Sequence, residues 1–309
     1  MTLPAASVQD ASAQEQVADL ERRFGGLRRL YGDAGYGRVR QARVAVVGLG
    51  GVGSWAVEAL ARSGVAELWL FDLDHVATSN VNRQVQALGS TLGQAKALAL
   101  RERIADIHPS CQVHAVEEFV AEDNWPALLG GPVDVLIDAC DQVRAKAVLA
   151  QWGLQAGVPV VCVGAAGGKR LAQAVEVADL VNVSHDPLLA SLRQRLRQGG
   201  SIARVRAAST VNSTTKAATQ AAGLRCVFSR EPVQLPELSG EAGNTDGSLN
   251  CHGYGSSVVV TATFGMVAAG EAIAQLLAAT AAHPAGLADF ADGFGLSSKA
   301  SQTAVDAGT

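Results

Sequence analysis

A glycine-rich turn placed directly after a short apolar run is the feature that most limits what this chain can fold into. Residues 44–47 read as a buried strand, and the sequence GLGGVGS follows from Gly48 to Ser54. A strand, a tight turn and a helix in this order point backbone N–H groups at an anion. The spacing satisfies both G-x-G-x-x-G, typical of NAD or FAD, and G-x-G-G-x-G-S, typical of ATP. The glycines alone leave both nucleotides open.

Strands and helices alternate through most of the remaining sequence. The apolar runs ELWLFD, CQVHAV, VDVLID and PVVCVG are separated by segments with helical periodicity. Strands that are apolar throughout and joined by helices predict a parallel sheet covered on both faces. We therefore expect an α/β fold with a doubly wound, mostly parallel, Rossmann-like sheet. Ligands bind such sheets beyond the carboxyl ends of the strands.

The regularity weakens after Gly168, where the C-terminal part becomes a polar excursion. VEVADL is a candidate strand there, and residues 184–197 read as a short polar helix. Residues 199–253 are rich in Ser, Thr, Gly and Asn, a composition that in so long a segment indicates function or partial disorder. No internal repeat is visible.

Composition divides the chain into one domain and two tails. The 309 residues, 48% hydrophobic and 17% charged, suffice for a sizeable core. Residues 1–20 and 283–309 are expected to be flexible tails. Residues 21–282 are expected to form a single nucleotide-binding domain, with the nucleotide site in 44–168 and a substrate-side region in 169–282.

Two features bear on the compartment. The five cysteines include no C-x-x-C pair, which predicts a reducing, cytoplasmic environment and no structural zinc. The first twenty residues lack a basic start followed by an apolar core, which argues against a signal peptide.

Residues 253–270 carry no charge over about the length of a short membrane span. Their hydroxyl residues and glycines favour a buried strand that turns into a buried helix, with membrane association as the alternative.

The choice between the nucleotides comes from the segment SNVNRQ. Its residues Asn80, Asn82, Arg83 and Gln84 place several donors in one loop. An arginine offers a planar fork of donors to phosphate oxygens, and the amides add neutral donors. Lys96, at the start of a helix, adds a point charge suited to the same phosphates. A triphosphate needs such a clamp, whereas hydride transfer does not, so the sequence predicts ATP.

Carboxylates follow two of the predicted strands. Asp72 ends the second strand, 19 residues after Gly53, where a carboxylate can accept hydrogen bonds from a ribose. Asp74 is placed with it among the nucleotide-binding residues. Asp141 lies just past another strand, where it can hold Mg²⁺ against the phosphates. Asp138 is interpreted as a structural cap or turn residue.

The order of these motifs resembles the ubiquitin-activating enzyme superfamily, which includes bacterial enzymes that adenylate small carrier proteins. The resemblance runs from about residue 23 to 168, with weaker matches to about 270. It implies that residues 21–282 are an ATP-binding adenylation domain, in which ATP and Mg²⁺ bind, a carboxylate is adenylated and pyrophosphate is released. The residues expected to bind the nucleotide are Gly48, Gly50, Gly51, Gly53, Asp72, Asp74, Asn80, Arg83, Gln84 and Lys96. Arg83, Lys96 and Asp141 are expected to be catalytic, and Asp141 to hold the metal.

Several segments resemble one branch of that superfamily, which modifies tRNA. They are RRFGGLRRLYG, NRQVQAL, VGAAGGK, HDPLLASLRQRLR, CVFSRE and VTATFG. The resemblance implies that ATP activates the carboxylate of threonylcarbamoyladenosine in tRNA, and that loss of AMP closes a ring. The absence of C-x-x-C pairs fits this branch better than the carrier-activating one. Adenylation of a ubiquitin-like sulfur-carrier protein, with a sulfur-relay partner, is the alternative.

The resemblance also implies a homodimer, in which an N-terminal arginine reaches the partner subunit's ATP. Arg22, Arg23 and Arg29 are the candidates, and the choice stays open. Because the net charge is −4, binding to tRNA needs a local basic patch. The candidates for phosphate contact are Arg193, Arg195, Arg197, Arg204 and Arg206, with Lys216 nearby. A solvated helix face followed by a loop is the other interpretation of this cluster.

The cysteines divide into two groups. Cys140 and Cys162 lie at strand ends and are interpreted as core residues. Cys226 and Cys251 lie in the polar excursion, where a sulfur-transfer or thioester role stays open. The expected chemistry needs no enzyme nucleophile, because the substrate's own nitrogen or oxygen can attack once its carboxylate is activated.

Overall fold

One mixed sheet forms the centre of the molecule. The structure, a computed structural model, describes residues 6–202, 222–234 and 254–282. In these residues seven strands pair in the order β3-β2-β1-β4-β5-β7-β6. Their bounds are Arg43–Val47 (β1), Glu67–Phe71 (β2), Gln112–Val116 (β3), Val135–Asp138 (β4), Val160–Val163 (β5), Val175–Asp179 (β6) and Arg225–Ser229 (β7). All neighbouring strands are parallel except β6 and β7. The predicted α/β, doubly wound, mostly parallel fold is confirmed.

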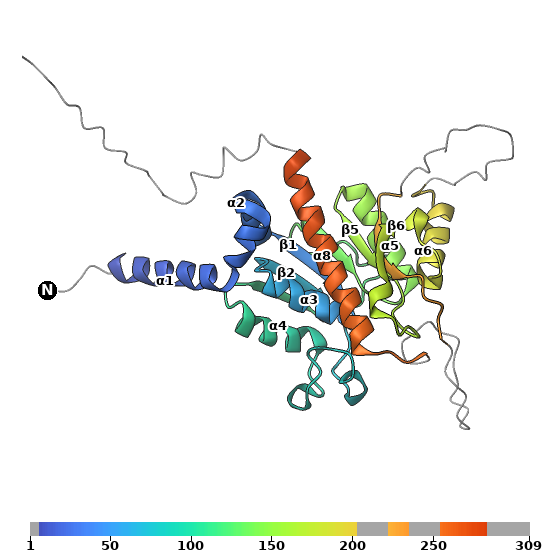
Figure 1. The fold of residues 1–309 in the computed structure, drawn as a ribbon, viewed down its shortest axis with the longest axis horizontal. Coiled ribbons are helices and arrows are strands. Elements are labelled where there is room, and N and C mark those ends of the chain that lie inside the picture. The colour runs from blue at the N-terminus through green and yellow to red at the C-terminus, as the bar shows by residue number, and fades with distance from the viewer. Residues whose placement is uncertain (1–5, 203–221, 235–253, 283–309) are drawn as a thin grey trace, which may run out of the picture.

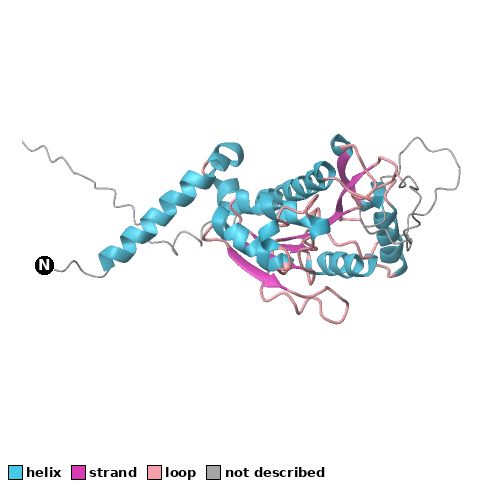
Figure 2. Ribbon diagram, turned by 90° about the horizontal axis from the view of Figure 1, so that it is seen from below, coloured by secondary structure: helices cyan, strands magenta, loops and turns pink. Residues whose placement is uncertain are grey.

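Helices cover both faces of the sheet, as Figures 1 and 2 show. Their bounds are Ala6–Phe24 (α1), Gly26–Gln41 (α2), Gly53–Arg62 (α3), Lys96–Ile107 (α4), Val143–Ala156 (α5), Pro187–Gln198 (α6) and Val258–Ala282 (α8). Short 3-10 turns span Thr78–Asn80 (η1), Gly89–Thr91 (η2), Ala172–Ala174 (η3) and Leu180–Asn182 (η4). This alternation of strand and helix follows the apolar runs from which the fold was predicted.

The alternation of side chains along β1 divides the core in two. Val44 and Val46 point to the face covered by α2, α3, α4 and α8, and Ala45 and Val47 point to the face covered by α5 and α6. Strand side chains alternate between faces, so a strand that is apolar at every position must be covered on both. The strand order reverses between β1 and β4, which opens a crevice at their carboxyl ends.

The N-terminal segment is helical where a flexible tail was expected. The helix α1 extends from Ala6 to Phe24 and projects from the body of the molecule (Figure 2). Its Ala and Gln residues favour helix. Asp19 forms ion pairs with Arg22 and Arg23, three and four residues away on the same helical face. The predicted C-terminal tail lies outside the described residues.

The segment predicted as strand and then helix is helical from Val258 onward. Phe264, Ala268 and Ala272 recur at helical spacing and are fully buried against the sheet and α3. Residues 258–278 form the one described helix that is long and apolar enough to cross a membrane, and 44% of that window is buried inside the protein. A helix that lies along a sheet needs this apolar stripe for packing.

The polar excursion contains an ordered strand that the sequence analysis missed. β7 inserts between β5 and β6, so Cys226 is fully buried instead of lying in a polar loop. The candidate strand VEVADL is confirmed as β6. The helix expected over residues 184–197 is α6, and it is amphipathic, because Leu189, Leu192 and Leu196 face the core.

We predict that Gly265→Ala destabilises the protein, because α3 leaves no room beside this part of α8. A Cβ at Gly265 would lie 2.5 Å from the Val52 carbonyl oxygen and 2.8 Å from the Trp55 Cβ. Overpacking of this kind costs about 1–3 kcal/mol, which urea unfolding would measure.

The matched control is Gly270→Ala on the same helix. A Cβ at Gly270 would have no neighbouring atom within 4 Å. Alanine is favoured over glycine within a helix by about 0.5–1 kcal/mol, so this variant should be slightly more stable than the parent. Equal losses of stability in both variants would contradict close packing of α8 on α3.

Candidate functional site

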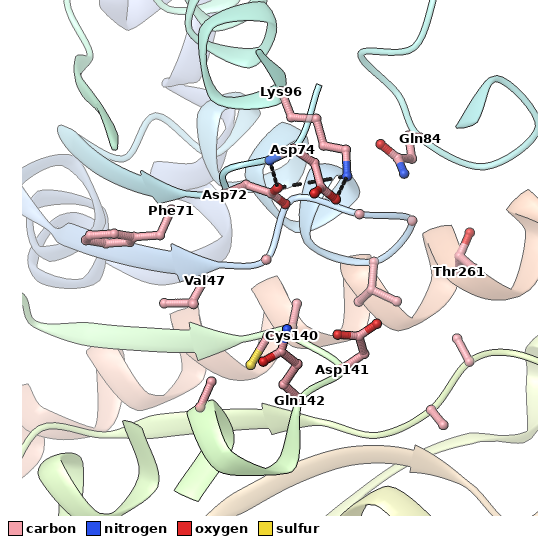
Figure 3. A pocket seen from close by; sticks show the side chains of 18 of the residues that line it. Val47, Phe71, Asp72, Asp74, Gln84, Lys96, Cys140, Asp141, Gln142 and Thr261 are labelled. Carbon is pink, nitrogen blue, oxygen red and sulfur yellow. Dashed lines mark hydrogen bonds and ion pairs between the residues drawn. The ribbon is translucent and has the colours of Figure 1, made fainter. Parts of the chain in front are cut away.

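A pocket lies at the carboxyl ends of the central strands, where the strand order reverses (Figure 3). The glycine turn after β1 forms one wall, and the loop that follows β4 forms the opposite wall. The predicted site residues that line the pocket are Gly48, Gly50, Gly51, Asp72, Asp74, Arg83, Gln84, Lys96 and Asp141. The structure thus brings together residues that are up to 93 positions apart in the sequence, from Gly48 to Asp141. Gly53 and Asn80 are the predicted residues that do not line it.

The glycines of the turn serve different purposes. Gly48 has φ of 86°, which favours glycine. A Cβ at Gly53 would lie 1.8 Å from the Gly48 carbonyl oxygen, so this position tolerates no side chain. Gly50 has open space around its Cβ position and lies at the pocket wall. Gly53 therefore closes the turn, while Gly48, Gly50 and Gly51 present backbone to the pocket.

Asp72 holds the turn in place. One carboxylate oxygen, Oδ2, accepts a hydrogen bond from the Leu49 N–H at 2.6 Å, and the other, Oδ1, accepts from the Asp74 N–H at 2.9 Å. Burial raises the pKa of Asp72, against the opposing attraction of Lys96. Acceptance of a ribose hydroxyl stays a prediction, and it would use the remaining lone pairs of these oxygens.

Lys96 lies between two carboxylates at the start of α4. Its Nζ is 2.7 Å from Asp74 Oδ2 and 3.9 Å from Asp72 Oδ1. The Lys96 side chain is only 7% exposed, whereas that of Asp74 is 58% exposed. Because Asp74 reaches solvent, it can swing away and leave Lys96 to a phosphate oxygen without stranding a buried charge.

The N-x-N-R-Q loop contributes two residues to the pocket and uses the asparagines to support itself. Arg83 donates to the Ser79 carbonyl at 2.6 Å and to Asn82 Oδ1 at 3.0 Å. Asn80 Oδ1 accepts from the Ala77 N–H at 3.0 Å, at the start of η1. Asn82 donates to the Ser256 carbonyl at 3.0 Å, which ties the loop to the segment before α8. The Asn80 side-chain oxygen thus caps the turn, and the expected contact of Asn80 with the nucleotide stays a prediction.

Asp141 faces the glycine turn from across the pocket (Figure 3). Its side chain is exposed, and it makes no hydrogen bond or ion pair with another described residue. The described residues contain no group of three or more His, Cys, Asp or Glu that could hold a metal. A carboxylate oxygen is a ligand that Mg²⁺ prefers, together with substrate phosphates and waters. The donor set therefore fits Mg²⁺ bound with ATP, and it does not form an all-protein metal cage.

A buried ion pair supports the loop that carries Asp141. Lys146 Nζ lies 3.0 Å from Asp138 Oδ2, outside hydrogen-bond geometry, and both side chains are fully buried. Lys146 also donates to the Asp138 carbonyl at 3.2 Å. Burial alone would lower the pKa of Lys146, but the Asp138 carboxylate raises it overall. The sequence analysis expected a structural Asp138 and missed Lys146, because its position in an alanine-rich helix gave no sign of burial.

The cysteines are placed differently from one another. Cys162 and Cys226 are buried neighbours across β5 and β7. Cys140 packs against the core, as expected, and also lines the pocket, and its thiol donates to Asp138 Oδ1 at 2.7 Å. Burial raises the pKa of the Cys140 thiol well above its usual value. Cys226 lies inside the sheet, out of reach of a substrate, and Cys251 lies outside the described residues.

The arginines expected to act outside this pocket have varied surroundings. Arg193 donates to the Leu180 and Val183 carbonyls at 3.0 and 2.8 Å, which fixes η4 against α6. Arg195 is exposed. Arg204, Arg206 and Lys216 lie outside the described residues, so a basic tRNA-binding patch stays a prediction.

Arg29 is the freest of the three N-terminal candidates. Arg23 donates to the Asp106 and Ile107 carbonyls, and Arg22 pairs with Asp19. Arg29 is exposed and has no hydrogen bond or ion pair with another described residue. Its reach into a partner subunit stays a prediction.

Comparison with known proteins gives consistent matches over most of the chain. The model of the ThiF family matches residues 24–301. A tRNA threonylcarbamoyladenosine dehydratase of Haemophilus influenzae is 37% identical over 85% of this chain and 96% of its own length. The enzyme of that name from Escherichia coli is 39% identical over 84% of this chain and 95% of its own length.

A solved structure and a more distant relative complete the comparison. The crystal structure of the Escherichia coli tRNA N6-threonylcarbamoyladenosine dehydratase in complex with ATP has a TM-score of 0.73 and 37% identity, covering 85% of this chain and 96% of that chain. A molybdopterin-synthase adenylyltransferase of Salmonella typhimurium is 36% identical over only 40% of this chain and 49% of its own length.

We predict that Lys146→Met lowers the free energy of unfolding by about 3–5 kcal/mol, because it leaves the Asp138 carboxylate buried without its cation. The double variant Asp138→Asn with Lys146→Met should recover most of that loss, since no unpaired charge remains. Denaturant unfolding of both variants would measure the difference. A double variant no more stable than Lys146→Met alone would contradict a coupled buried pair.

Proposed function

This chain belongs to the ThiF family, and we propose that it is an ATP-dependent enzyme that closes threonylcarbamoyladenosine in tRNA to its cyclic form. The observation that carries this proposal is the pocket itself. The glycine turn, Arg83, Lys96 and Asp141 surround one space at the strand ends. The two dehydratases of that name match more than four fifths of this chain, which supports the same reaction here.

The reaction divides into two steps. In the first, a carboxylate oxygen of the threonyl group attacks the α-phosphorus of ATP, and pyrophosphate leaves with the electrons of the broken P–O bond. In the second, a nitrogen or oxygen of the substrate's own carbamoyl group attacks the activated carbonyl carbon. The bond between this carbon and the oxygen that carries the adenylyl group then breaks, AMP leaves with that oxygen and the electrons of the bond, and the carbamoyl group loses one N–H proton. The substrate has then lost one water at the expense of ATP cleavage to AMP and pyrophosphate.

The residues of the pocket would stabilise negative charge on the phosphates and would not act as nucleophiles. Negative charge shifts toward the leaving pyrophosphate in the first step, and fixed cations stabilise it best when they need no rearrangement. Arg83 is held by two hydrogen bonds on its own loop, so its orientation is set before ATP arrives. Lys96 would exchange Asp74 for a phosphate oxygen. A Mg²⁺ ion on Asp141 would supply charge neutralisation at the phosphates.

Proximity accounts for the second step. Once the carboxylate is activated, its attacker is part of the same molecule, and intramolecular attack needs no enzyme nucleophile. The pocket would hold the adenylate and exclude water while the ring closes. Cys226, inside the sheet, has no part in this scheme.

The proposal extends to partners and location. The substrate would be tRNA carrying the modified adenosine, and exposed arginines such as Arg195 would bind it. The reaction would take place in the cytoplasm. The enzyme would be a homodimer, in which Arg29 is the N-terminal arginine with the most freedom to reach a second subunit. Association of residues 253–270 with a membrane is the less favoured reading, because the apolar face of α8 packs on the sheet.

The alternative function is adenylation of the C-terminus of a ubiquitin-like sulfur-carrier protein. The shorter likeness to a molybdopterin-synthase adenylyltransferase supports it, and the first chemical step would be the same. It would involve a sulfur-relay protein as partner. The two functions differ in the molecule whose carboxylate is activated, so the substrate decides between them.

We predict that exchange of labelled pyrophosphate into ATP depends on tRNA carrying threonylcarbamoyladenosine. A purified ubiquitin-like carrier protein should give no exchange above the rate without substrate. Mass spectrometry of the digested tRNA should then detect loss of one water from the modified nucleoside. Exchange with the carrier protein and none with tRNA would favour the alternative function.

We predict that Arg83→Ala lowers the rate of ring closure by about a thousandfold or more, as loss of an arginine on a transferring phosphoryl group does. The affinity for tRNA should change far less, because this loss is felt mainly in the transition state. Asp141→Asn should also lower the rate, and added Mg²⁺ should recover only part of it. Single-turnover assays would measure both.

Two surface variants serve as controls for this series. Arg101→Ala removes an exposed arginine on α4, and Asp123→Asn removes an exposed carboxylate outside the pocket. Both should keep the rate of the parent enzyme. Full activity of Arg83→Ala would overturn its assigned role in stabilising the phosphates.

A further inference from the structure

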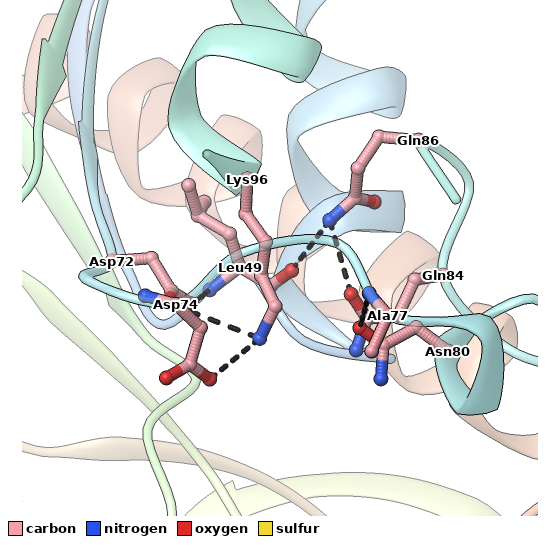
Figure 4. Close-up of polar contacts among 8 residues, drawn as sticks. All are labelled: Leu49, Asp72, Asp74, Ala77, Asn80, Gln84, Gln86 and Lys96. Carbon is pink, nitrogen blue, oxygen red and sulfur yellow. Dashed lines mark hydrogen bonds and ion pairs between the residues drawn. The ribbon is translucent and has the colours of Figure 1, made fainter. Parts of the chain in front are cut away.

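The residue in the middle of the glycine turn, Leu49, is held from both sides by side chains (Figure 4). Its N–H donates to Asp72 Oδ2 at 2.6 Å, and its carbonyl accepts from Gln86 Nε2 at 2.9 Å. Asp72 was expected from the sequence, whereas Gln86 was not. Gln86 is 1% exposed, and it lies behind the pocket rather than at its wall.

The orientation of the Gln86 amide is fixed by its surroundings. Its Nε2 group has two N–H bonds, and each has an acceptor, the Leu49 carbonyl at 2.9 Å and Gln84 Oε1 at 3.1 Å. A flipped amide would place an oxygen against two acceptors and lose both bonds. The Gln86 backbone is held as well, because Thr91 donates to its carbonyl at 2.5 Å. The Leu49 carbonyl therefore selects the direction in which Gln86 points.

Gln86 in turn fixes the orientation of Gln84. Because Gln84 Oε1 accepts from Gln86, the amide nitrogen of Gln84 is the end left for other partners. Gln84 lines the pocket and is 5% exposed. A buried amide can present either its donor or its acceptor end to a ligand, and the contact with Gln86 leaves the donor end. Donors are what phosphate oxygens require.

We propose that Gln86 is a positioning residue that aims the amide donors of Gln84 at the phosphates of ATP, without touching the nucleotide itself. The proposal rests on ATP binding in this pocket. The Leu49 carbonyl in the glycine turn fixes the orientation of Gln86, and Gln86 fixes the orientation of Gln84. A correctly formed turn and a correctly oriented donor therefore occur together. The buried Gln86 amide thereby links the glycine turn to the Gln84 donor.

The test uses Gln86→Met in the full-length protein, with affinities for ATP and for adenosine measured by calorimetry. Methionine is unbranched and adapts to irregular space, but it donates no hydrogen bond to Gln84. Loss of one donor to a charged group should weaken ATP binding by about tenfold. Adenosine has no phosphates, so its affinity should be unchanged. General damage to the pocket would weaken both ligands alike.

A double variant tests whether Gln86 acts through Gln84. In a Gln84→Ala background the amide to be aimed is absent, so Gln86→Met should weaken ATP binding by at most about a further twofold, because two residues that act through one donor do not add. A further tenfold loss would overturn the proposal, because Gln86 would then act by another route. Gln94→Met is the control, since Gln94 also donates to a side chain, Glu102 at 2.7 Å, but away from the pocket. It should bind ATP like the parent.

The outcomes separate this inference from the proposed function. A parent protein that binds ATP, together with a Gln86→Met variant that binds it equally well, would overturn the positioning role and leave the function standing. Equal losses for ATP and adenosine would also overturn it. A parent protein that binds no ATP would overturn both.

Discussion

The hydrogen bond between the Leu49 N–H and the buried Asp72 carboxylate joins the two halves of the nucleotide site. It connects the turn after β1 to the end of β2 across 2.6 Å, so the glycine turn cannot move independently of the neighbouring strand. The turn itself is tightly closed, because a Cβ at Gly53 would clash with the Gly48 carbonyl oxygen. Lys96 is placed relative to this corner, because it pairs with Asp74 just beyond it.

The opposite wall is rigid for a different reason. Asp138 and Lys146 form an ion pair with no solvent contact, and removal of water from such a pair makes its geometry hard to change. Asp138 ends β4, three residues before Asp141, and Lys146 lies in α5, five residues after it. The carboxylate expected to meet Mg²⁺ is thus exposed and unpaired among the described residues, on a loop whose base is fixed. An exposed carboxylate on a loop that is anchored in this way is suited to bind a charged ligand such as Mg²⁺.

The sequence predicted the sheet and the pocket better than the supports behind them. Apolar runs and the glycine spacing depend on local pattern, so β1, α3 and the nucleotide turn were predictable. β7 was missed because it is flanked by polar segments, which local composition cannot distinguish from a loop. The role of Asn80 as a cap of η1 was not predicted either. The supporting roles of Gln86 and Lys146 could not be predicted, because they depend on burial and on contacts that the sequence pattern does not show.

The charges that line the pocket limit how ATP can bind. Its described lining contains two cationic side chains, Arg83 and Lys96, and four carboxylates, those of Asp72, Asp74, Glu118 and Asp141. A triphosphate would add further negative charge to a site that is not positive by its side chains. Backbone N–H groups at the start of α3 offset part of this charge. A Mg²⁺ ion on Asp141 and an arginine from a second subunit, both part of the proposed function, would supply the remaining positive charge.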